Sequence, residues 1–551
     1  MKLRTLTHIL IITFCAGLLA QVHAVSPPPD GCYPNLTTAE GCKALHSLTS
    51  GVANTGIGWY SLSGTSTGSY NTAVGAGALD LNSADNNTAV GVATLLLNTT
   101  GTNNTANGTA ALVFNGSGEG NTATGAFAMY SNTEGDFNTA NGEFALYFNT
   151  TGARNTAVGD SALYLNTEGS RNTAIGNPTM LNNVTGDDNT AIGASALFSN
   201  NGSDNTAIGA DALSDNTTGD ENTATGSSAL SSNTTGFFNT AVGAHALLNN
   251  TTGNRNTAAG HEALLSNTEG VGNAAYGTDA LSSNTTGGDN VAIGNATLSS
   301  NTTGAENTAI GDTALPNNTT GANNTGLGRE AMFDNTTGTS NTAIGYLALS
   351  NNTSGIGNIA LGAFAGTGVT TADGVICIGT DGQNLSQSCF IGHIFGTTSP
   401  GGIPVLVNTD GKLGTVVSSQ RFKEAIKPMS EASKLLFALK PVTFRYKKDV
   451  DASGASQFGL VAEDVEKVSP DLIVRDKDGK AYSVRYDQVN AMLLNEFLKE
   501  HQKNEKQEST IAQQQQQIEA LQRGLKEQKA LIEKVTARMD NAAPRLIGDA
   551  L

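Results

Sequence analysis

A serine and a lysine five residues apart, such as Ser418 and Lys423 of this 551-residue sequence, could together support nucleophilic catalysis. A serine hydroxyl becomes a nucleophile when a base removes its proton. Lysine can act as that base when burial lowers its pKa enough to leave the amine neutral. A single self-cleavage needs no substrate pocket and no release step. A serine and a lysine five residues apart are common, however, so the interpretation depends on the surrounding segments.

Other catalytic or metal-binding sets do not emerge from the sequence. The seven histidines are scattered, and His261-Glu262 lacks the second histidine of a zinc-protease helix. The aspartate pairs Asp449/Asp451 and Asp476/Asp478 lack the rest of a calcium loop. We therefore expect no metal, no cofactor and no enzymatic action on an external substrate.

The N-terminus has the pattern of an export signal, which we assign to residues 1–24. Lys2 and Arg4 precede an apolar run over residues 9–20, and Val22-His23-Ala24 offers small residues for cleavage. A membrane anchor is the alternative, but the run is too short to cross a bilayer. The sequence thus predicts an exported protein, secreted or at the cell surface, with no membrane span after signal removal.

Four cysteines would remain after removal of the signal, which contains Cys15. They form two near pairs, Cys32/Cys42 and Cys377/Cys389. In an oxidising compartment such pairs are expected to form disulfides that close short loops, here at the two ends of the repeats. Their spacing does not suit zinc.

The balance of basic and acidic residues changes at Ser418. Residues 418–551 carry 22 basic and 20 acidic side chains, whereas the residues before them carry 8 and 28. A body so poor in lysine and arginine cannot neutralise phosphates, so nucleic acid is not an expected partner. The change in composition predicts a domain boundary at Ser418.

Repeats of 17 residues fill most of the chain. Residues 222–238 give one unit, with Asn-Thr-Ala-Thr-Gly at its start, Ala-Leu in its middle and Asn-Thr-Thr-Gly near its end. The unit starts run from Asn54 to Asn358, and the units at Asn71 and Asn189 are one residue short within the Asn/Gly segment. Deletions are tolerated in turns, so that segment is predicted to be the turn. With a divergent copy in residues 25–53, the N-terminal cap, this makes about twenty units.

A period this short suits one coil of a parallel β-solenoid, so we predict a mainly β shaft over residues 54–366. Each coil would have a short strand, a bend at the first glycine, a second short stretch at Ala-Leu and a glycine turn. The asparagines at positions one and twelve of the unit would form ladders along the stack. These ladders explain the many Asn-x-Thr triplets better than glycosylation does, because the triplets recur wherever the turn recurs.

Both faces of each strand are predicted to need burial. Ala174 and Ile175 are adjacent and apolar, and neighbours in a strand point to opposite faces. A single coil encloses little core, so a homotrimer in which three rolls share a seam is the favoured solution. The alternative is a monomeric solenoid with an apolar stripe.

The Asn-Thr-Ala-Ile-Gly motif resembles the head repeats of trimeric autotransporter adhesins, which are parallel β-rolls. The resemblance covers about residues 37–366. The 17-residue unit is longer than the usual head repeat, and the chain ends in a charged helix rather than a membrane-barrel segment. The resemblance therefore implies a β-roll without implying an autotransporter.

The chain after the repeats is predicted to hold a connector (residues 367–417), a small α+β domain (418–500), a coiled coil (501–540) and a tail (541–551). The coiled coil rests on an apolar residue every seven positions, at Ile511, Ile518, Leu525, Ile532 and Met539. A solvated amphipathic helix is the alternative.

Three segments of the α+β domain resemble the intramolecular chaperone of phage endosialidases and tail fibres, the peptidase S74 family. They are residues 418–424 (SSQRFKE), 440–446 (KPVTFRY) and 459–465 (GLVAEDV), followed by Pro470 and residues 484–486 (VRY). The resemblance implies a trimer that helps a β-rich stalk to fold and then releases itself. It implies Ser418 as the nucleophile, Lys423 as the base and Val417–Ser418 as the bond cut.

Together these features favour a trimeric, adhesin-like surface fibre that binds an unknown glycan, protein or other surface. Two alternatives stay open. A prophage tail fibre fits the S74 resemblance, although an export signal argues against it. A secreted fibre that binds ice or polymer surfaces would use the threonine at position two, but these threonines stand singly rather than as a Thr-x-Thr array.

Overall fold

The computed structural model describes residues 34–408 and 410–541 and divides the chain into two units, one ending at Thr397 and one beginning at Thr398. The predicted signal peptide and Cys32 lie outside the described residues. The predicted boundary at Ser418 falls inside the second unit.

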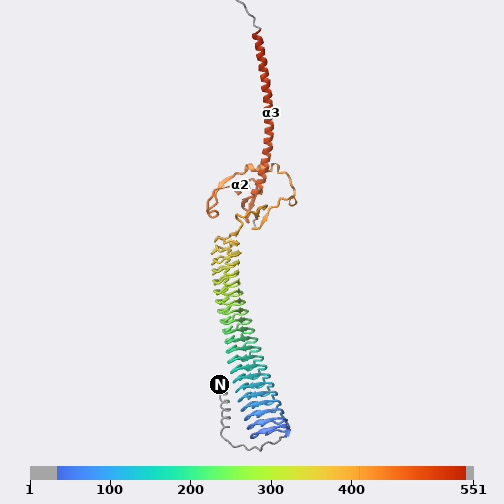
Figure 1. Ribbon diagram of the computed structural model, residues 1–551, viewed down its shortest axis with the longest axis vertical. Coiled ribbons are helices and arrows are strands. Elements are labelled where there is room, and N and C mark those ends of the chain that lie inside the picture. The colour runs from blue at the N-terminus through green and yellow to red at the C-terminus, as the bar shows by residue number, and fades with distance from the viewer. Residues whose placement is uncertain (1–33, 409, 542–551) are drawn as a thin grey trace, which may run out of the picture. The chain divides into compact units, whose positions relative to one another are not determined.

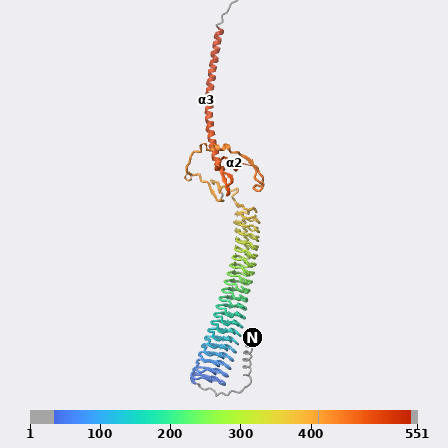
Figure 2. The same cartoon turned by 180° about the vertical axis from the view of Figure 1, so that it is seen from behind.

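The first unit is a parallel β-solenoid, in which successive coils stack from the blue end to the yellow end of the repeats (Figure 1). The same unbroken stack is seen from behind (Figure 2). A short 3₁₀ turn, η2 (Pro34–Leu36), precedes a sheet of 22 strands. The strands are β1 (Thr38–Glu40), β2 (Thr55–Ile57), β3 (Thr72–Val74), β4 (Thr88–Val90), β5 (Thr105–Asn107), β6 (Thr122–Thr124), β7 (Thr139–Asn141), β8 (Thr156–Val158), β9 (Thr173–Ile175), β10 (Thr190–Ile192), β11 (Thr206–Ile208), β12 (Thr223–Thr225), β13 (Thr240–Val242), β14 (Thr257–Ala259), β15 (Ala274–Tyr276), β16 (Val291–Ile293), β17 (Thr308–Ile310), β18 (Thr325–Leu327), β19 (Thr342–Ile344), β20 (Ile359–Leu361), β21 (Ile376–Ile378) and β22 (Cys389–Ile391).

Each strand pairs in parallel with the next strand along the chain, and equivalent positions of the repeat stand opposite each other. Ala207 of β11, for example, faces Ala224 of β12. The fold class predicted from the period is therefore confirmed. The sheet also continues through β21 and β22, within the segment predicted as a connector.

The core of the solenoid is narrow and built from small side chains. In most coils the middle residue of the strand and the Ala-Leu pair are fully buried, as with Ala224, Ala229 and Leu230. They join into one continuous cluster along the stack. The Ala-Leu stretch is a turn rather than a strand, because Leu230 has a positive φ of 52°. It still binds the next coil, since Leu230 N donates to Ala246 O at 3.0 Å.

The first glycine of the unit is required by its backbone. Gly226 has a φ of 138°, and a Cβ there would lie 2.5 Å from the carbonyl oxygen of Gly243 in the next coil. A side chain at this position would be strained in itself and would push two coils apart. The predicted bend at this glycine is thus a point of close contact between coils.

Two asparagine ladders run through the interior, at the predicted positions one and twelve. At position twelve, Asn233 Nδ2 donates to Asn216 Oδ1 at 2.7 Å and to Gly236 O at 2.9 Å. At position one, Asn222 Nδ2 donates to Gly236 O at 2.8 Å. Both side chains are fully buried. Their hydrogen bonds therefore do two things: they satisfy buried amide groups, and they hold the backbone of the turn at Gly236.

The two short coils confirm where the turn lies. Asn98 and its equivalents bind a carbonyl three residues ahead, at Gly101. Asn82 and Asn200 bind one only two residues ahead, at Ala84 and Gly202. The missing residue therefore falls directly after the position-twelve asparagine, where the sequence predicted it.

An aromatic cluster covers part of the solenoid surface between residues 96 and 164. The rings of Tyr130 and Tyr147 stack at 5.1 Å between centroids, and those of Tyr147 and Tyr164 at 5.3 Å. Burial, together with the neighbouring phenols Tyr130 and Tyr164, raises the pKa of Tyr147 to about 12. The cluster therefore favours the protonated phenol.

Alkaline pH is expected to weaken the solenoid through Tyr147. A pKa that is higher in the folded than in the unfolded chain gives stability that is complete below pH ~10 and lost as the pH rises toward 12. Between pH 9 and 11.5 the free energy of unfolding of wild type should fall by about 2 kcal/mol more than that of Tyr147→Phe. Thermal unfolding at both pH values measures this, with exposed Tyr276→Phe as the control. An unchanged pH dependence in Tyr147→Phe would contradict it.

The second unit is small and mixed. Its elements are β23 (Val405–Val407) paired with β24 (Leu413–Thr415), η3 (Gln420–Phe422), η4 (Ser430–Ala438), β25 (Val442–Phe444) paired with β26 (Gln457–Gly459), α2 (Ala462–Val468), η5 (Pro470–Leu472), β27 (Ile473–Arg475) paired with β28 (Ala481–Val484), and α3 (Tyr486–Asp540). Only four side chains, Val465, Leu472, Ile473 and Val484, form its buried core. The helix α3 runs unbroken for 55 residues and includes residues 501–540, the segment predicted as a coiled coil.

Candidate self-cleavage site at Ser418 and Lys423

Ser418 and Lys423 lie on either side of a single tight turn. The chain leaves β24 at Thr415, and the 3₁₀ turn η3 follows Ser419. Phe422 N donates to Ser419 O, and Lys423 N donates to Gln420 O, both at 3.0 Å. This turn folds the chain back so that its two flanking side chains meet.

The predicted pair is in direct contact. Lys423 Nζ lies 3.1 Å from Ser418 Oγ, within hydrogen-bond distance. In this contact the ammonium donates to the hydroxyl, whereas a base must accept the hydroxyl proton. The two atoms are thus close enough for Ser418 to pass its proton to a neutral Lys423.

The surroundings of the pair are open and apolar. Ser418 and Lys423 are both exposed in the single chain, and so are Val416, Val417 and Phe422. Desolvation favours the neutral form of a lysine amine, and the exposed pair has no such cover in the single chain. A partner that covered the apolar neighbours would supply it.

Residues 418–474 match the family model Peptidase_S74, described as chaperone of endosialidase. The match begins at Ser418 itself and ends within β27. The resemblance noted in the sequence is therefore confirmed for this segment, which we call the S74 segment. The match describes that segment and not the whole chain.

No curated protein and no solved structure matches the chain. The similarity of the repeats to adhesin head repeats accordingly stays a prediction.

A second serine–lysine contact joins the S74 segment to α3, and no sequence pattern predicted it. Ser433 of η4 is fully buried, receives a hydrogen bond from Asn495 Nδ2 at 2.6 Å and donates one to Glu496. Lys499 Nζ lies 3.5 Å from Ser433 Oγ, but its hydrogen bond to Glu496 raises the pKa of Lys499. That lysine stays protonated, so this cluster fastens η4 to α3 and does not form a catalytic pair.

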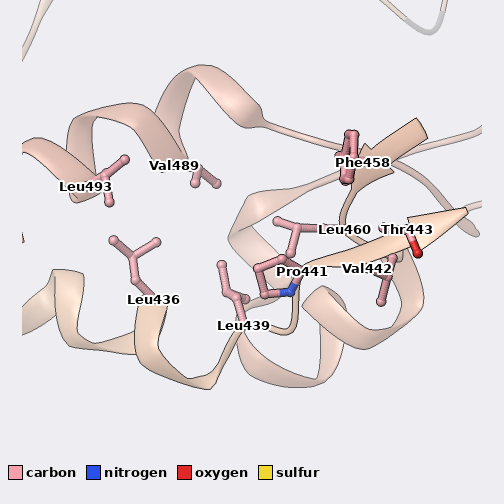
Figure 3. Close-up of a pocket in the computed structure, with 10 residues that line it drawn as sticks. Leu436, Leu439, Pro441, Val442, Thr443, Phe458, Leu460, Val489 and Leu493 are labelled. Carbon is pink, nitrogen blue, oxygen red and sulfur yellow. The ribbon is translucent and has the colours of Figure 1, made fainter. Parts of the chain in front are cut away.

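An apolar groove of about 740 Å³ opens in the second unit, between η4, the β25–β26 pair and α3. Figure 3 shows Leu436 of η4 and Leu439, directly after η4, facing Val489 and Leu493 of α3, with Phe458 at the far end. The groove carries no charged side chain on its walls. It therefore offers packing surface and no chemistry.

Of the four cysteines predicted to pair, the three that the structure describes, Cys42, Cys377 and Cys389, are free thiols. Cys377 is the middle residue of β21 and is buried, whereas Cys389 is the first residue of β22 and is exposed. In register, Cys377 stands opposite Phe390 rather than Cys389. The proposed Cys377–Cys389 disulfide would need β22 to shift by one residue, which would turn its side chains to the other face. Cys42 is exposed.

Among the described residues, no helix is long and apolar enough to cross a membrane.

Proposed function

We propose that this chain is one subunit of an exported trimeric fibre, in which the solenoid is the lasting shaft and the second unit is a chaperone that aligns three chains and then cuts itself off. The observation that carries the proposal is the 3.1 Å contact between Ser418 and Lys423 at the first residue of the S74 match. That residue begins the S74 segment, and a cut directly before it would separate the segment from the solenoid.

The chemistry follows from the place of Ser418 directly after the bond to be cut. Neutral Lys423 takes the hydroxyl proton, and Ser418 Oγ attacks the carbonyl carbon of Val417. The Val417–Ser418 C–N bond breaks, the amine of Ser418 takes a proton, and an ester joins Val417 to Oγ. Water then hydrolyses the ester, which frees Val417 as a carboxylate and restores the hydroxyl.

Assembly would supply the missing desolvation. The exposed apolar residues beside the pair, Val416, Val417 and Phe422, are the surface that neighbouring chains would cover. Covering them would desolvate the Lys423 amine and so favour the neutral form that can accept the Ser418 proton. Cleavage would then follow assembly, and only aligned fibres would lose the chaperone.

The outer face of the solenoid sheet is the observation that favours a trimer. The third strand residue of most coils is a large apolar side chain that is about two-fifths exposed in the single chain. We call this row the outer stripe; it comprises Ile57, Val90, Ile175, Ile192, Ile208, Val242, Tyr276, Ile293, Leu327, Ile344, Leu361, Ile378 and Ile391. Polar residues interrupt it at Asn107, Thr124, Asn141 and Thr225. A row of this length is much larger than the apolar patches of ordinary monomers, which favours burial between chains.

Near-identical coils create the need for a chaperone. Three shafts could pair one coil out of step with little loss of contact, because each coil fits its neighbour's equivalent almost as well. The helix α3 could fix the ends in register, since its heptad residues Ile511, Ile518 and Leu525 are all exposed and available for a coiled coil.

Export belongs to the proposal on the strength of the N-terminal pattern of residues 1–24. An exported fibre would keep its solenoid outside the cell. The acidic excess of the first 417 residues suits such a fibre by keeping shafts soluble and apart.

Charge placed on the outer stripe is expected to separate the shafts. In the double variant Ile192→Lys/Ile208→Lys, three chains would each lose two buried apolar contacts worth about 1.5–3 kcal/mol and gain two buried ammonium groups. Light scattering on the purified protein should give the mass of one full-length chain, because cleavage follows assembly. Val184→Lys, an exposed apolar residue outside the stripe, is the matched control and should stay trimeric. A trimeric double variant would show that the stripe is not the interface.

A further inference from the structure

Two histidines of the solenoid lie close together, on adjacent coils. In residues 54–366 of the sequence, histidine occurs only at His245 and His261. They lie on adjacent coils, those of β13 and β14. His245 Nδ1 lies 3.9 Å and His261 Nε2 lies 3.7 Å from Glu262 Oε1. One ligand atom from each of the three residues falls within 4.8 Å of the others.

The repeat explains this meeting. His245 and Glu262 are 17 residues apart, so they occupy the same position on neighbouring coils. Both have left-handed backbones, with φ values of 59° and 57°, which direct equivalent side chains the same way. Glu262 N donates to Ala244 O at 3.1 Å and holds the two coils together at this point. Because the coils are stacked by the sheet, the three side chains are neighbours in every folded chain.

The carboxylate of Glu262 is too far from either imidazole for a hydrogen bond. At 3.7 and 3.9 Å both imidazole–carboxylate separations are longer than hydrogen bonds. The three ends are partly exposed, so they can rotate by the small amount that brings ligand atoms about 3.4 Å apart, as around a tetrahedral zinc ion with bonds of about 2.1 Å. Two imidazoles and one carboxylate are a common zinc donor set.

We propose that His245, His261 and Glu262 bind one zinc-class divalent cation per chain. Imidazole nitrogens favour zinc, copper and nickel over calcium and magnesium. The site is therefore expected to bind the first three metals more tightly than the last two. The ion would cross-link the coils of β13 and β14 and keep one coordination position for water or an outside ligand. The acidic excess of the shaft adds a general attraction for cations.

Isothermal titration of the untagged full-length chain with Zn²⁺ tests the site. Wild type should bind one more Zn²⁺ per chain than His245→Ala/His261→Ala, and Glu262→Gln should weaken that site at least tenfold. The double variant His393→Ala/His501→Ala removes two histidines elsewhere and should match wild type. Zn²⁺ should also raise the thermal midpoint of wild type and of this control, but not that of His245→Ala/His261→Ala.

Equal zinc stoichiometry in wild type and in His245→Ala/His261→Ala would overturn the proposal. All three proposed ligands are partly exposed, so these substitutions should leave the coils folded. Should the double histidine variant not fold, Glu262→Gln alone decides: unchanged affinity and an unchanged thermal shift would also overturn the proposal.

Discussion

The Ser418→Ala chain should remain full length, while the wild-type chain is cut into fragments that end at Val417 and begin at Ser418. Alanine removes the hydroxyl that attacks the Val417 carbonyl, and loss of a nucleophile slows such reactions by about a thousandfold or more. Denaturing intact-mass spectrometry of both chains after purification measures the outcome directly.

Three controls separate chemistry from folding. Ser419→Ala removes the neighbouring hydroxyl and should cut normally, because Lys423 contacts Ser418. Lys423→Met keeps most of the side-chain length without the amine and should block cutting as Ser418→Ala does. Lys499→Met removes the lysine beside Ser433 and should leave the chemistry at Val417–Ser418 unchanged. Cutting in Ser418→Ala, or blocked cutting in Ser419→Ala, would contradict the assignment.

Asn250→Asp is expected to unfold the coils around β13. Asn250 Nδ2 donates to Asn233 Oδ1 at 2.8 Å and to Gly253 O at 3.0 Å, and Asn250 Oδ1 accepts from Asn267 at 2.8 Å. A carboxylate there keeps the acceptor and loses both donors, so a buried charge would face two oxygens. The expected cost is about 3 kcal/mol or more. Hydrogen exchange should show lost protection centred on these coils.

The adjacent residue provides a matched control. Asn249 is exposed, so Asn249→Asp makes the same chemical change one residue away and should leave exchange within the range of surface substitutions. The effect of Asn250→Asp should also shrink as the pH falls, because the protonated carboxyl regains one donor. Equal protection in both variants would show that the ladder contributes little to stability.

Much of the shaft could be predicted because the repeat exposes its own constraints. A 17-residue period excludes helical hairpins, the two deletions locate the turn, and the asparagines mark the ladders. The conformation of the Ala-Leu stretch could not be predicted, since nothing in the residue type of Leu230 favours a positive φ. Stacking against the next coil imposes it.

Contacts between individual side chains were harder to predict from the sequence than the fold. Ser418 and Lys423 are close in sequence, and one turn joins them. His245 and Glu262 meet only because the repeat places position seven of successive coils together, and that signal was available in the 17-residue spacing. Cys377 and Cys389 have a spacing that suggests a disulfide, but strand register sends them to opposite faces. Ser433 and Lys499 meet through packing of η4 on α3, which no sequence pattern records.

Native mass spectrometry of the purified wild-type protein tests the central claim most directly, because it reports chain number and chain length together. We expect the shaft to have the mass of three chains that all end at Val417, with the fragment from Ser418 onward released. A shaft of single chains, or three chains that all retain the S74 segment, would contradict the proposal.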